Sequence, residues 1–233
     1  MVGILGGMGP AASAAFYTRL TALTPAATDQ EHLPVLLWSD STIPDRSAAV
    51  LGMGADPSAH ILRGLSLLEN AGATLIAVPC NTAHFFLRRL SARVSVPVVD
   101  MVRETCRVVR ASSPPLRRVG LLGTSGLVSA GLYQRELRAT GVGCLTPSNE
   151  QQAWVDQAIA HVKARDLDRA GPLLASCARA LVEHGCEAII AGCTEIPLAL
   201  TAEVGARLID PGLILAQRCV TIATRQRATG SAS

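Results

Sequence analysis

Two of the cysteines stand where a thiol can carry out proton chemistry. Cys80 and Cys193 each follow a short aliphatic run, and each precedes residues able to cap a helix, namely Asn81 or Thr82, and Thr194. A thiol at the start of a helix is expected to have a lowered pKa, because the helix dipole and unpaired backbone N–H groups favour the thiolate. Two such thiols facing each other can take a proton from one face of a carbon and return one to the other face, as racemisation requires.

The other cysteines are expected to be structural. Cysteine is among the residue types most often buried, so core packing is the expected role of the remaining five: Cys106, Cys144, Cys177, Cys186 and Cys219. The chain contains no Cys-x-x-Cys pair that would indicate a zinc ribbon or a redox pair. Reduced thiols are therefore expected, and no metal site.

The elements that position the two thiols are short aliphatic strands alternating with amphipathic helices. The predicted strands are residues 2–5, 35–38, 74–78, 96–99, 119–122, 187–191 and 207–209. This alternation predicts an α/β fold with parallel sheets. In such a sheet the residues just beyond the carboxyl ends of strands line the ligand crevice, and Cys80 and Cys193 both occupy such positions.

The two halves of the chain resemble each other. Three pairs of segments match in the same order: 2–6 with 119–123, 72–82 with 185–195, and 98–100 with 208–210. Ordered matches of this kind indicate an internal duplication. We therefore predict two similar doubly wound parallel-sheet domains related by pseudo-two-fold symmetry, with the active site in the cleft between them.

A Pro/Ser stretch marks the predicted domain crossing. Residues 111–116 read Ala-Ser-Ser-Pro-Pro-Leu and show no periodicity. We predict an N-terminal domain of residues 1–111, completed by a C-terminal helix 211–233, and a second domain of residues 117–210.

Composition excludes several classes of partner. The 233 residues are 49% hydrophobic and 17% charged, and the net charge of +3 is not gathered in any Lys/Arg block. With only 3% aromatic residues there is no stacking platform, so nucleic acid is not an expected partner. No apolar run reaches the ~18 residues of a spanning helix, and the N-terminus reads as a strand without a basic leader. A cytoplasmic location without a membrane partner is expected.

Five motifs together resemble the aspartate racemase family, within the cofactor-independent aspartate/glutamate/hydantoin racemase superfamily. They are Gly3-Ile4-Leu5-Gly6-Gly7-Met8-Gly9-Pro10, Asp29-Gln30-Glu31-His32, Ile43-Pro44-Asp45-Arg46, Pro79-Cys80-Asn81-Thr82-Ala83-His84 and Gly192-Cys193-Thr194-Glu195. The similarity runs from the first strand to Asp210-Pro211. It implies a catalytic Cys80/Cys193 pair, no pyridoxal phosphate, metal or nucleotide, and a homodimer.

The resemblance also implies the residues that bind a small acidic amino acid. Arg46 and Lys163 would reach the substrate carboxylates. The pocket would be shaped by Asn81, Thr82, Thr124, Thr194 and the glycine turn around Met8. One position departs from the family: Leu127 stands where a threonine is usual, so recognition of the distal carboxylate is less secure than the reaction type.

The chemistry of Arg46 and Lys163 supports their assignment as the cations that bind the substrate carboxylates. Lys163 is the only lysine beside twenty arginines, which indicates a site that needs a compact charge instead of a planar fork. The alternative is an ordinary solvated helix lysine. Arg46 follows a proline in a long loop, and a guanidinium suits a bidentate carboxylate clamp. A surface arginine paired with Asp45 or Asp40 is the alternative.

Two further residues are expected to act behind the thiols. His84 lies four residues after Cys80, a spacing that could ligate a metal, but no further ligand stands at metal spacing. We interpret it as a supporting or structural histidine. Glu195 would raise the pKa of the Cys193 thiol and favour its protonated, proton-donating form.

Competing functions remain open at this point. Residues 7–12 fit G-x-G-x-x-A after a strand, as in dinucleotide-binding oxidoreductases, but the acidic residue expected about 20 positions on is at best Asp29, before the second strand. A relative that binds an amino acid without turning it over is a second alternative. Glutamate or hydantoin racemases, maleate isomerases and arylmalonate decarboxylases are others. We predict a racemase that interconverts L- and D-aspartate, with glutamate as an open alternative.

Overall fold

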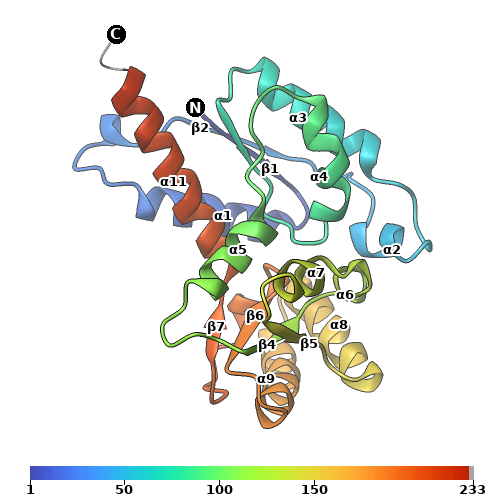
Figure 1. The fold of residues 1–233 in the computed structure, drawn as a ribbon. Coiled ribbons are helices and arrows are strands. Elements are labelled where there is room, and N and C mark those ends of the chain that lie inside the picture. Colours follow the sequence, from blue (N-terminus) through green and yellow to red (C-terminus); the bar gives the residue numbers. More distant parts are fainter. Residues whose placement is uncertain (231–233) are drawn as a thin grey trace.

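The computed structural model describes residues 1–230, which form two α/β halves joined at their strand ends (Figure 1). The last three residues of the predicted helix 211–233 lie outside the described residues. The first half contains a parallel sheet of three strands in the order β2-β1-β3. The second contains a parallel sheet of four in the order β5-β4-β6-β7. The predicted fold class is confirmed.

The first half is built from residues before the Pro/Ser stretch. Its strands are β1 (Val2–Gly6), β2 (Val35–Ser39) and β3 (Leu75–Ala77). Its helices are α1 (Pro10–Leu23), α2 (Arg46–Val50), α3 (Ser58–Asn70), α4 (His84–Leu90) and α5 (Met101–Arg110). Two short 3₁₀ turns, Asp29–Glu31 and Ser91–Arg93, complete it.

The second half repeats this plan. Its strands are β4 (Arg118–Leu122), β5 (Gly143–Leu145), β6 (Ala188–Ala191) and β7 (Arg207–Ile209). Its helices are α6 (Ser125–Ala130), α7 (Leu132–Arg138), α8 (Asn149–Lys163), α9 (Leu167–Glu183) and α10 (Ile196–Ala199). The order β5-β4-β6 corresponds to β2-β1-β3, as a duplication requires.

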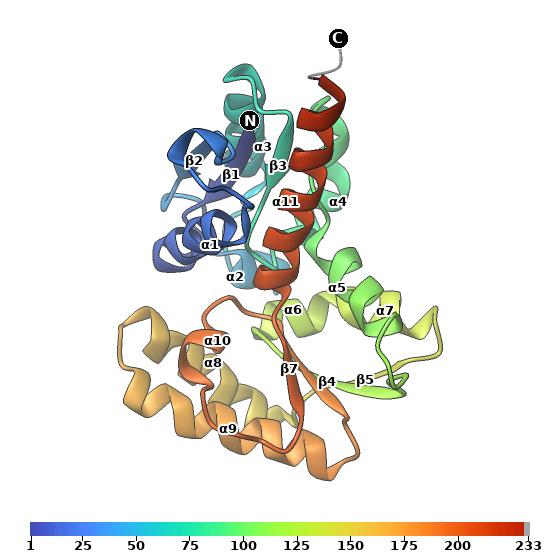
Figure 2. The ribbon, with the colours of Figure 1, turned by 90° about the vertical axis from the view of Figure 1, so that its left-hand side faces the viewer.

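The last helix returns to the first half. Helix α11 (Pro211–Gly230) follows β7 and packs against α1 and α5, alongside the first sheet (Figure 2). Residues 111–116 form an irregular segment between α5 and β4. The boundaries 1–111, 117–210 and 211 onward stay a prediction.

Two strand predictions were wrong. Residues 96–99 form only a bridge from Val98 to Ile76, because Pro97 has no N–H to give to a ladder. Ile76 N and Val99 N still bond across this edge, so the segment occupies the place of a fourth strand. Strand β5 was missed, since it is only three residues long and begins with a glycine.

Alternating side chains of each strand enter separate cores on the two faces of its sheet. In β1, Ile4 packs in the cluster under α1 and α11, and its neighbour Leu5 packs in the cluster under α3. In the second half, Leu121 and Leu122 divide in the same way. Every strand is therefore fixed on both sides, which holds its carboxyl end, and the loop after it, in place.

Four helices near the junction of the halves, α2, α5, α6 and α8, begin at capping side chains. In α2, α5 and α6 the side chain of the residue before the helix accepts a hydrogen bond from the backbone N–H of the helix's third residue. These capping residues are Asp45, Asp100 and Thr124. Ser148 and Gln151 form a reciprocal capping box at the start of α8. These caps fix the points at which the chain turns from the strand ends into the helices.

The five cysteines expected to be structural are free thiols. Four of them, Cys106, Cys177, Cys186 and Cys219, are buried, and Cys144 is half-buried. Burial raises the pKa of Cys106, Cys144 and Cys219 to about 12 and that of Cys177 to about 11. They hold their protons at neutral pH and are chemically inert there.

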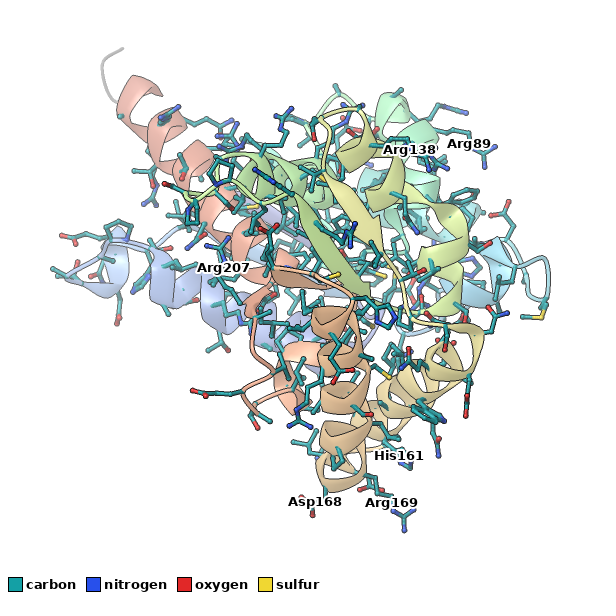
Figure 3. All side chains as sticks on the ribbon, turned by 60° about the horizontal axis from the view of Figure 1, so that its bottom comes forward. Arg89, Arg138, His161, Asp168, Arg169 and Arg207 are labelled. Carbon is teal, nitrogen blue, oxygen red and sulfur yellow. The ribbon has the colours of Figure 1, made fainter. Side chains whose placement is uncertain are left out.

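Charged side chains are spread over the surface of the protein. In Figure 3 the labelled side chains are spread over the view, with Arg89 and Arg138 at the upper right, Arg207 at the left, and His161, Asp168 and Arg169 at the bottom. Within residues 1–230, no helix combines the length and the apolar character needed to cross a membrane.

Candidate active site

The two cysteine loops lie at equivalent strand ends of the two halves. Cys80 follows β3 and Cys193 follows β6, as the repeat predicted. The loop after β4, residues 123 and 124, contacts both cysteine loops. Thr82 Oγ1 lies 3.1 Å from Thr124 Oγ1, and Gly123 packs against Gly192, the residue before Cys193. The carboxyl ends of both sheets therefore meet at the junction of the halves.

The predicted capping of helices by the residues after each thiol was wrong. Helix α4 begins after Ala83 and α10 after Glu195, and neither has a side-chain cap. The hydroxyls and amide predicted as caps are used in other contacts, because the cysteine loops continue for two or three residues before the helices begin. The helix dipole therefore does not act on Cys193 as expected.

Cys193 is instead held by a carboxylate. Its Sγ donates to Glu195 Oε2 at 2.9 Å, and Thr194 Oγ1 donates to the same oxygen at 3.1 Å. Burial and then the Glu195 carboxylate raise the pKa of the Cys193 thiol well above its usual range, while the Lys163 ammonium opposes this increase. The expected lowering of this pKa was wrong, and the thiol carries its proton at neutral pH.

A small cavity lies beside Glu195, between the two halves. It has a volume of about 270 Å³, and its lining includes Arg46, Lys163 and Glu195 together with Gly7 and Gly9 of the first glycine turn. A Cβ atom on Gly9 would lie 3.0 Å from Glu195 Oε1, which shows how closely the halves approach. Two cations and one carboxylate leave this cavity with an excess of positive charge.

Arg46 has an unused donor. Its Nη1 donates to the carbonyls of Ile43 and Pro44 at 3.1 Å each, which fixes the guanidinium against the loop after β2. Its Nε is buried and has no hydrogen-bond partner among the described residues. Since a buried unpaired donor is costly, this arrangement favours an anionic ligand. The alternative pairing of Arg46 with Asp45 or Asp40 is not formed.

Lys163 is the last residue of α8 and is exposed at the cavity rim. Among the described residues its ammonium forms no ion pair, and the carboxylate that lines the same cavity is that of Glu195. A lysine at a helix end also complements the helix dipole, which is the structural role it would have without a ligand.

The glycine turn lines the cavity with Gly7 and Gly9, and the Met8 side chain points into the core instead. Met8 is buried in the apolar cluster that also contains Cys80, while Gly7 and Gly9 line the cavity. Gly7 has a φ of +91°, and a Cβ there would lie 2.3 Å from the backbone of Asp40, so only glycine fits. Ser13 holds the turn, accepting from Gly7 N at 2.9 Å and donating to Gly9 O at 2.7 Å.

His84 ties the Cys80 loop to α5. Its Nδ1 bonds the Cys80 carbonyl at 2.9 Å, and its Nε2 accepts from Met101 N at 3.0 Å. The ring is therefore a neutral Nδ1–H tautomer with both nitrogens used, which leaves none for a metal. Within residues 1–230, no three His, Cys, Asp or Glu side chains gather as a metal-holding group.

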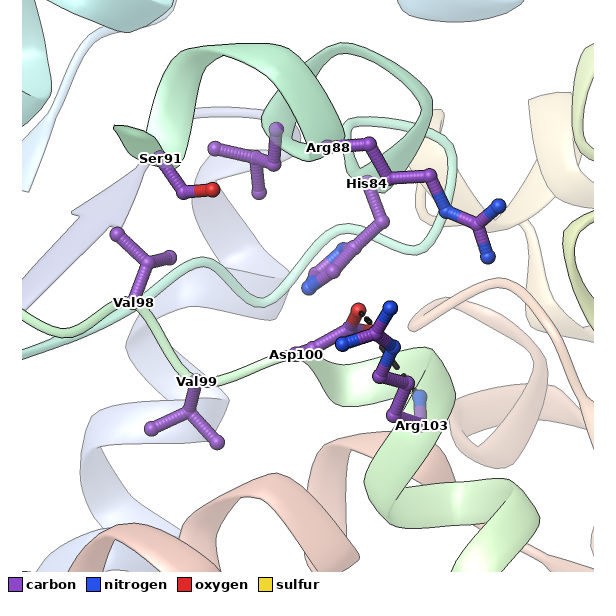
Figure 4. A pocket seen from close by; sticks show the side chains of 8 residues that line it. His84, Arg88, Ser91, Val98, Val99, Asp100 and Arg103 are labelled. Carbon is purple, nitrogen blue, oxygen red and sulfur yellow. Dashed lines mark hydrogen bonds and ion pairs between the residues drawn. The ribbon is translucent and has the colours of Figure 1, made fainter. Parts of the chain in front are cut away.

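A second cavity opens on the outer side of His84. It measures about 280 Å³ and is bordered by Arg88, Asp100 and Arg103 (Figure 4). Its arginines are already paired: Arg88 bonds Glu136 at 2.8 Å, and Arg103 lies 3.6 Å from Asp100. Unlike the cavity beside Glu195, it offers no unpaired cation.

Leu127 does not form a wall of the cavity beside Glu195. It is fully buried in the apolar cluster of the second half, where its side chain packs against Gly123 and Gly192. The leucine that replaces the family's threonine therefore packs beneath the loops that carry Thr124 and Cys193, and its side chain does not line this cavity.

The predicted residues fall into two groups. Arg46, Lys163 and Glu195 share the cavity, with Cys193 and Thr194 bonded to that glutamate. A second group meets at the Cys80 loop, where Thr82 contacts Thr124 and where Asn81 is bonded by a residue that the sequence did not single out, Tyr133. The available signal was that Tyr133 is one of only two tyrosines in the chain.

A duplicated α/β fold with a thiol at the same strand end of each half, and cations between them, defines an enzyme of the amino-acid racemase class. The chain belongs to the Asp/Glu/Hydantoin racemase family, whose model matches residues 5–219. The protein is an amino-acid racemase.

Individual relatives act on different amino acids. The chain is 28% identical over 227 residues to the broad specificity amino-acid racemase RacX of Bacillus subtilis, covering 95% of this chain and 97% of that one. It is 30% identical to the Picrophilus torridus aspartate racemase structure, with a TM-score of 0.86 over 96% of this chain and 94% of that one. A glutamate racemase of Shewanella baltica is 30% identical over 170 residues, 69% of this chain and 59% of that one. The family is confirmed, and these names do not agree on the substrate.

Proposed function

We propose that the protein interconverts L- and D-aspartate by proton transfer between Cys80 and Cys193, without pyridoxal phosphate or metal. The observation that carries this proposal is the hydrogen bond between the Cys193 thiol and Glu195, beside a cavity lined by Arg46 and Lys163. Two cations suit a substrate with two carboxylates, and the volume of about 270 Å³ suits a small one. The similarity to an aspartate racemase over nearly the whole chain supports aspartate; glutamate and broad specificity are the alternatives.

The mechanism uses the two thiols in turn. For one enantiomer, the Cys80 thiolate takes the α-proton and Cys193 gives its own proton to the opposite face. Arg46 and Lys163 hold the carboxylates and offset the negative charge that develops as the α-proton leaves. The first direction leaves Cys80 as the thiol and Cys193 as the thiolate, and this form acts on the other enantiomer: the Cys193 thiolate takes the α-proton and the Cys80 thiol supplies a proton to the opposite face. Glu195 Oε2 lies 2.9 Å from the Cys193 sulfur, so the carboxylate favours the form with the proton on Cys193.

The test is isotope exchange. We expect L-aspartate incubated with the protein and EDTA in heavy water, without added pyridoxal phosphate, to gain deuterium at the α-carbon and lose optical rotation together. A panel that includes glutamate identifies the preferred substrate. Absence of exchange with every acidic amino acid would contradict the proposed reaction and favour a relative that only binds its ligand.

Glu195 gives a pH-dependent prediction. Glu195→Gln removes a negative charge next to Cys193, so the pKa of that thiol should fall toward its ordinary value, although burial still raises it. In a Cys80→Ala background, alkylation of Cys193 by iodoacetamide should then begin at lower pH than in Cys80→Ala alone. Unchanged alkylation profiles would show that the carboxylate does not hold the proton on Cys193.

The expected homodimer and the cytoplasmic location stay predictions. The roles that the family resemblance implies for Met8, Asn81, Thr82, Thr124 and Thr194, and the supporting role interpreted for His84, are part of the same proposal.

A further inference from the structure

Tyr133 reaches from the second half into the Cys80 loop of the first. Its side chain is fully buried at the start of α7, and its hydroxyl donates to Asn81 Oδ1 at 2.5 Å. Burial raises the pKa of this hydroxyl well above its usual range, so it keeps its proton at neutral and mildly alkaline pH. Tyr133 is therefore a permanent donor to the Asn81 amide.

The other end of that amide is unused. Asn81 is 3% exposed, and its Nδ2 is a buried donor with no hydrogen-bond partner among the described residues. Because Tyr133 occupies Oδ1, the amide is oriented with its NH₂ group free. A buried NH₂ group next to a reactive thiol is complementary to an oxygen that carries negative charge.

We propose that Tyr133 is a positioning residue, which fixes the Asn81 amide across the junction of the halves so that its NH₂ group faces a carboxylate oxygen of the bound amino acid. The inference rests on the proposed reaction at Cys80. The carboxylate next to the α-carbon gains charge when the α-proton is removed. A donor fixed in advance stabilises that charge more than it stabilises the bound substrate, so it should act mainly on kcat.

The position of Tyr133 makes this alignment depend on contact between the halves. Helix α7 lies on the side of the second half that faces the first, next to α5 (Figures 1 and 2). One turn after Tyr133, Glu136 bonds Arg88 of the first half at 2.8 Å at the surface. Glu136 joins the same two halves without touching Asn81, so it provides a matched control.

The test is a double-mutant cycle on aspartate racemisation. We expect Tyr133→Phe to lower kcat/KM about 10- to 100-fold, with most of the loss in kcat. Asn81→Leu should lower it at least as much, and Asn81→Leu/Tyr133→Phe no further than Asn81→Leu alone. Replacing both partners by apolar groups of similar shape also avoids an unpaired buried oxygen, so the double variant is the one most certain to fold. Glu136→Gln should stay within about two-fold of the wild type.

Three results would overturn the inference: activity of Tyr133→Phe within two-fold of wild type, losses that multiply in the double variant, or an equal loss in Glu136→Gln. A readout independent of turnover is the NMR signal of the Asn81 side-chain NH₂, assigned by its loss in Asn81→Leu. It should shift and broaden in Tyr133→Phe but not in Glu136→Gln, and an unchanged signal in Tyr133→Phe would also overturn the inference. If wild-type protein racemises no acidic amino acid, the proposed function fails, and the NMR result still decides whether Tyr133 orients Asn81.

Discussion

Replacing either Cys80 or Cys193 by alanine is expected to abolish racemisation in both directions, lowering kcat/KM by at least about 10³-fold. Each turnover needs one group to take the α-proton and another to supply a proton from the opposite face. Because L- and D-aspartate have equal free energies, kcat/KM must be the same in the two directions, so both must fall together. Circular dichroism of the reaction mixture measures the loss, and thermal unfolding shows that each variant keeps its fold.

The single-thiol variants should differ in isotope exchange. In heavy water the remaining thiol can still remove the α-proton from the enantiomer that faces it and return a deuteron to the same face. Cys193→Ala and Cys80→Ala should therefore catalyse α-exchange with retention, each on the opposite hand of aspartate. Cys219→Ala, which removes a buried thiol of α11, is the control and should keep full activity. Substantial racemisation by either single-thiol variant would exclude the two-thiol mechanism.

The second large loss of activity is expected when Arg46 is replaced by alanine. Its guanidinium is fixed by two carbonyls, its Nε is buried without a partner, and the residue lines the cavity. Arg46→Ala would leave a substrate carboxylate without its charged partner, which costs about 3 kcal/mol, or roughly 100-fold in kcat/KM. Steady-state kinetics with L- and D-aspartate measure it. Arg63→Ala is the control, because Arg63 is an exposed arginine of the same half that lies 3.6 Å from Asp40. Equal activities of the two variants would contradict the assignment.

Lys163→Arg tests the other cation more sharply. It keeps the charge and the favourable position at the end of α8 but replaces a compact ammonium by a planar fork in a small cavity. A fall in kcat/KM with an unchanged unfolding temperature is expected. Full activity would show that the single lysine of the chain is incidental.

Sequence reasoning succeeded where a signal was local. The two thiols were found because each ends a buried aliphatic run and because the halves repeat, and the structure places both at equivalent strand ends. The predictions from sequence were wrong where a tertiary contact decided which group a side chain bonds. Asn81, Thr82 and Thr194 looked like helix caps, but their side chains bond Tyr133, Thr124 and Glu195 instead.

The pKa of Cys193 shows most clearly what the sequence alone cannot predict. Its place before a helix predicted a lowered value, and the separate expectation for Glu195 predicted a raised one. Only the fold decides between them, because it buries the thiol and brings its sulfur to 2.9 Å from the carboxylate. Similarly, the family resemblance related Leu127 to recognition of the distal carboxylate, and its packing against Gly192 places the side chain in the core.

The sequence alone determined the α/β class, the duplicated plan, the thiol pair and the family, because strand periodicity, repeats and motif spacing depend on neighbouring residues. The tertiary structure decided which cations share a cavity, which carboxylate contacts the Cys193 thiol and which residue bonds Asn81. Those properties depend on burial and on distances between groups such as Arg46 and Lys163 or Asn81 and Tyr133. Residues so far apart in the chain meet only when both sheets have folded and docked, so no local pattern encodes their separation.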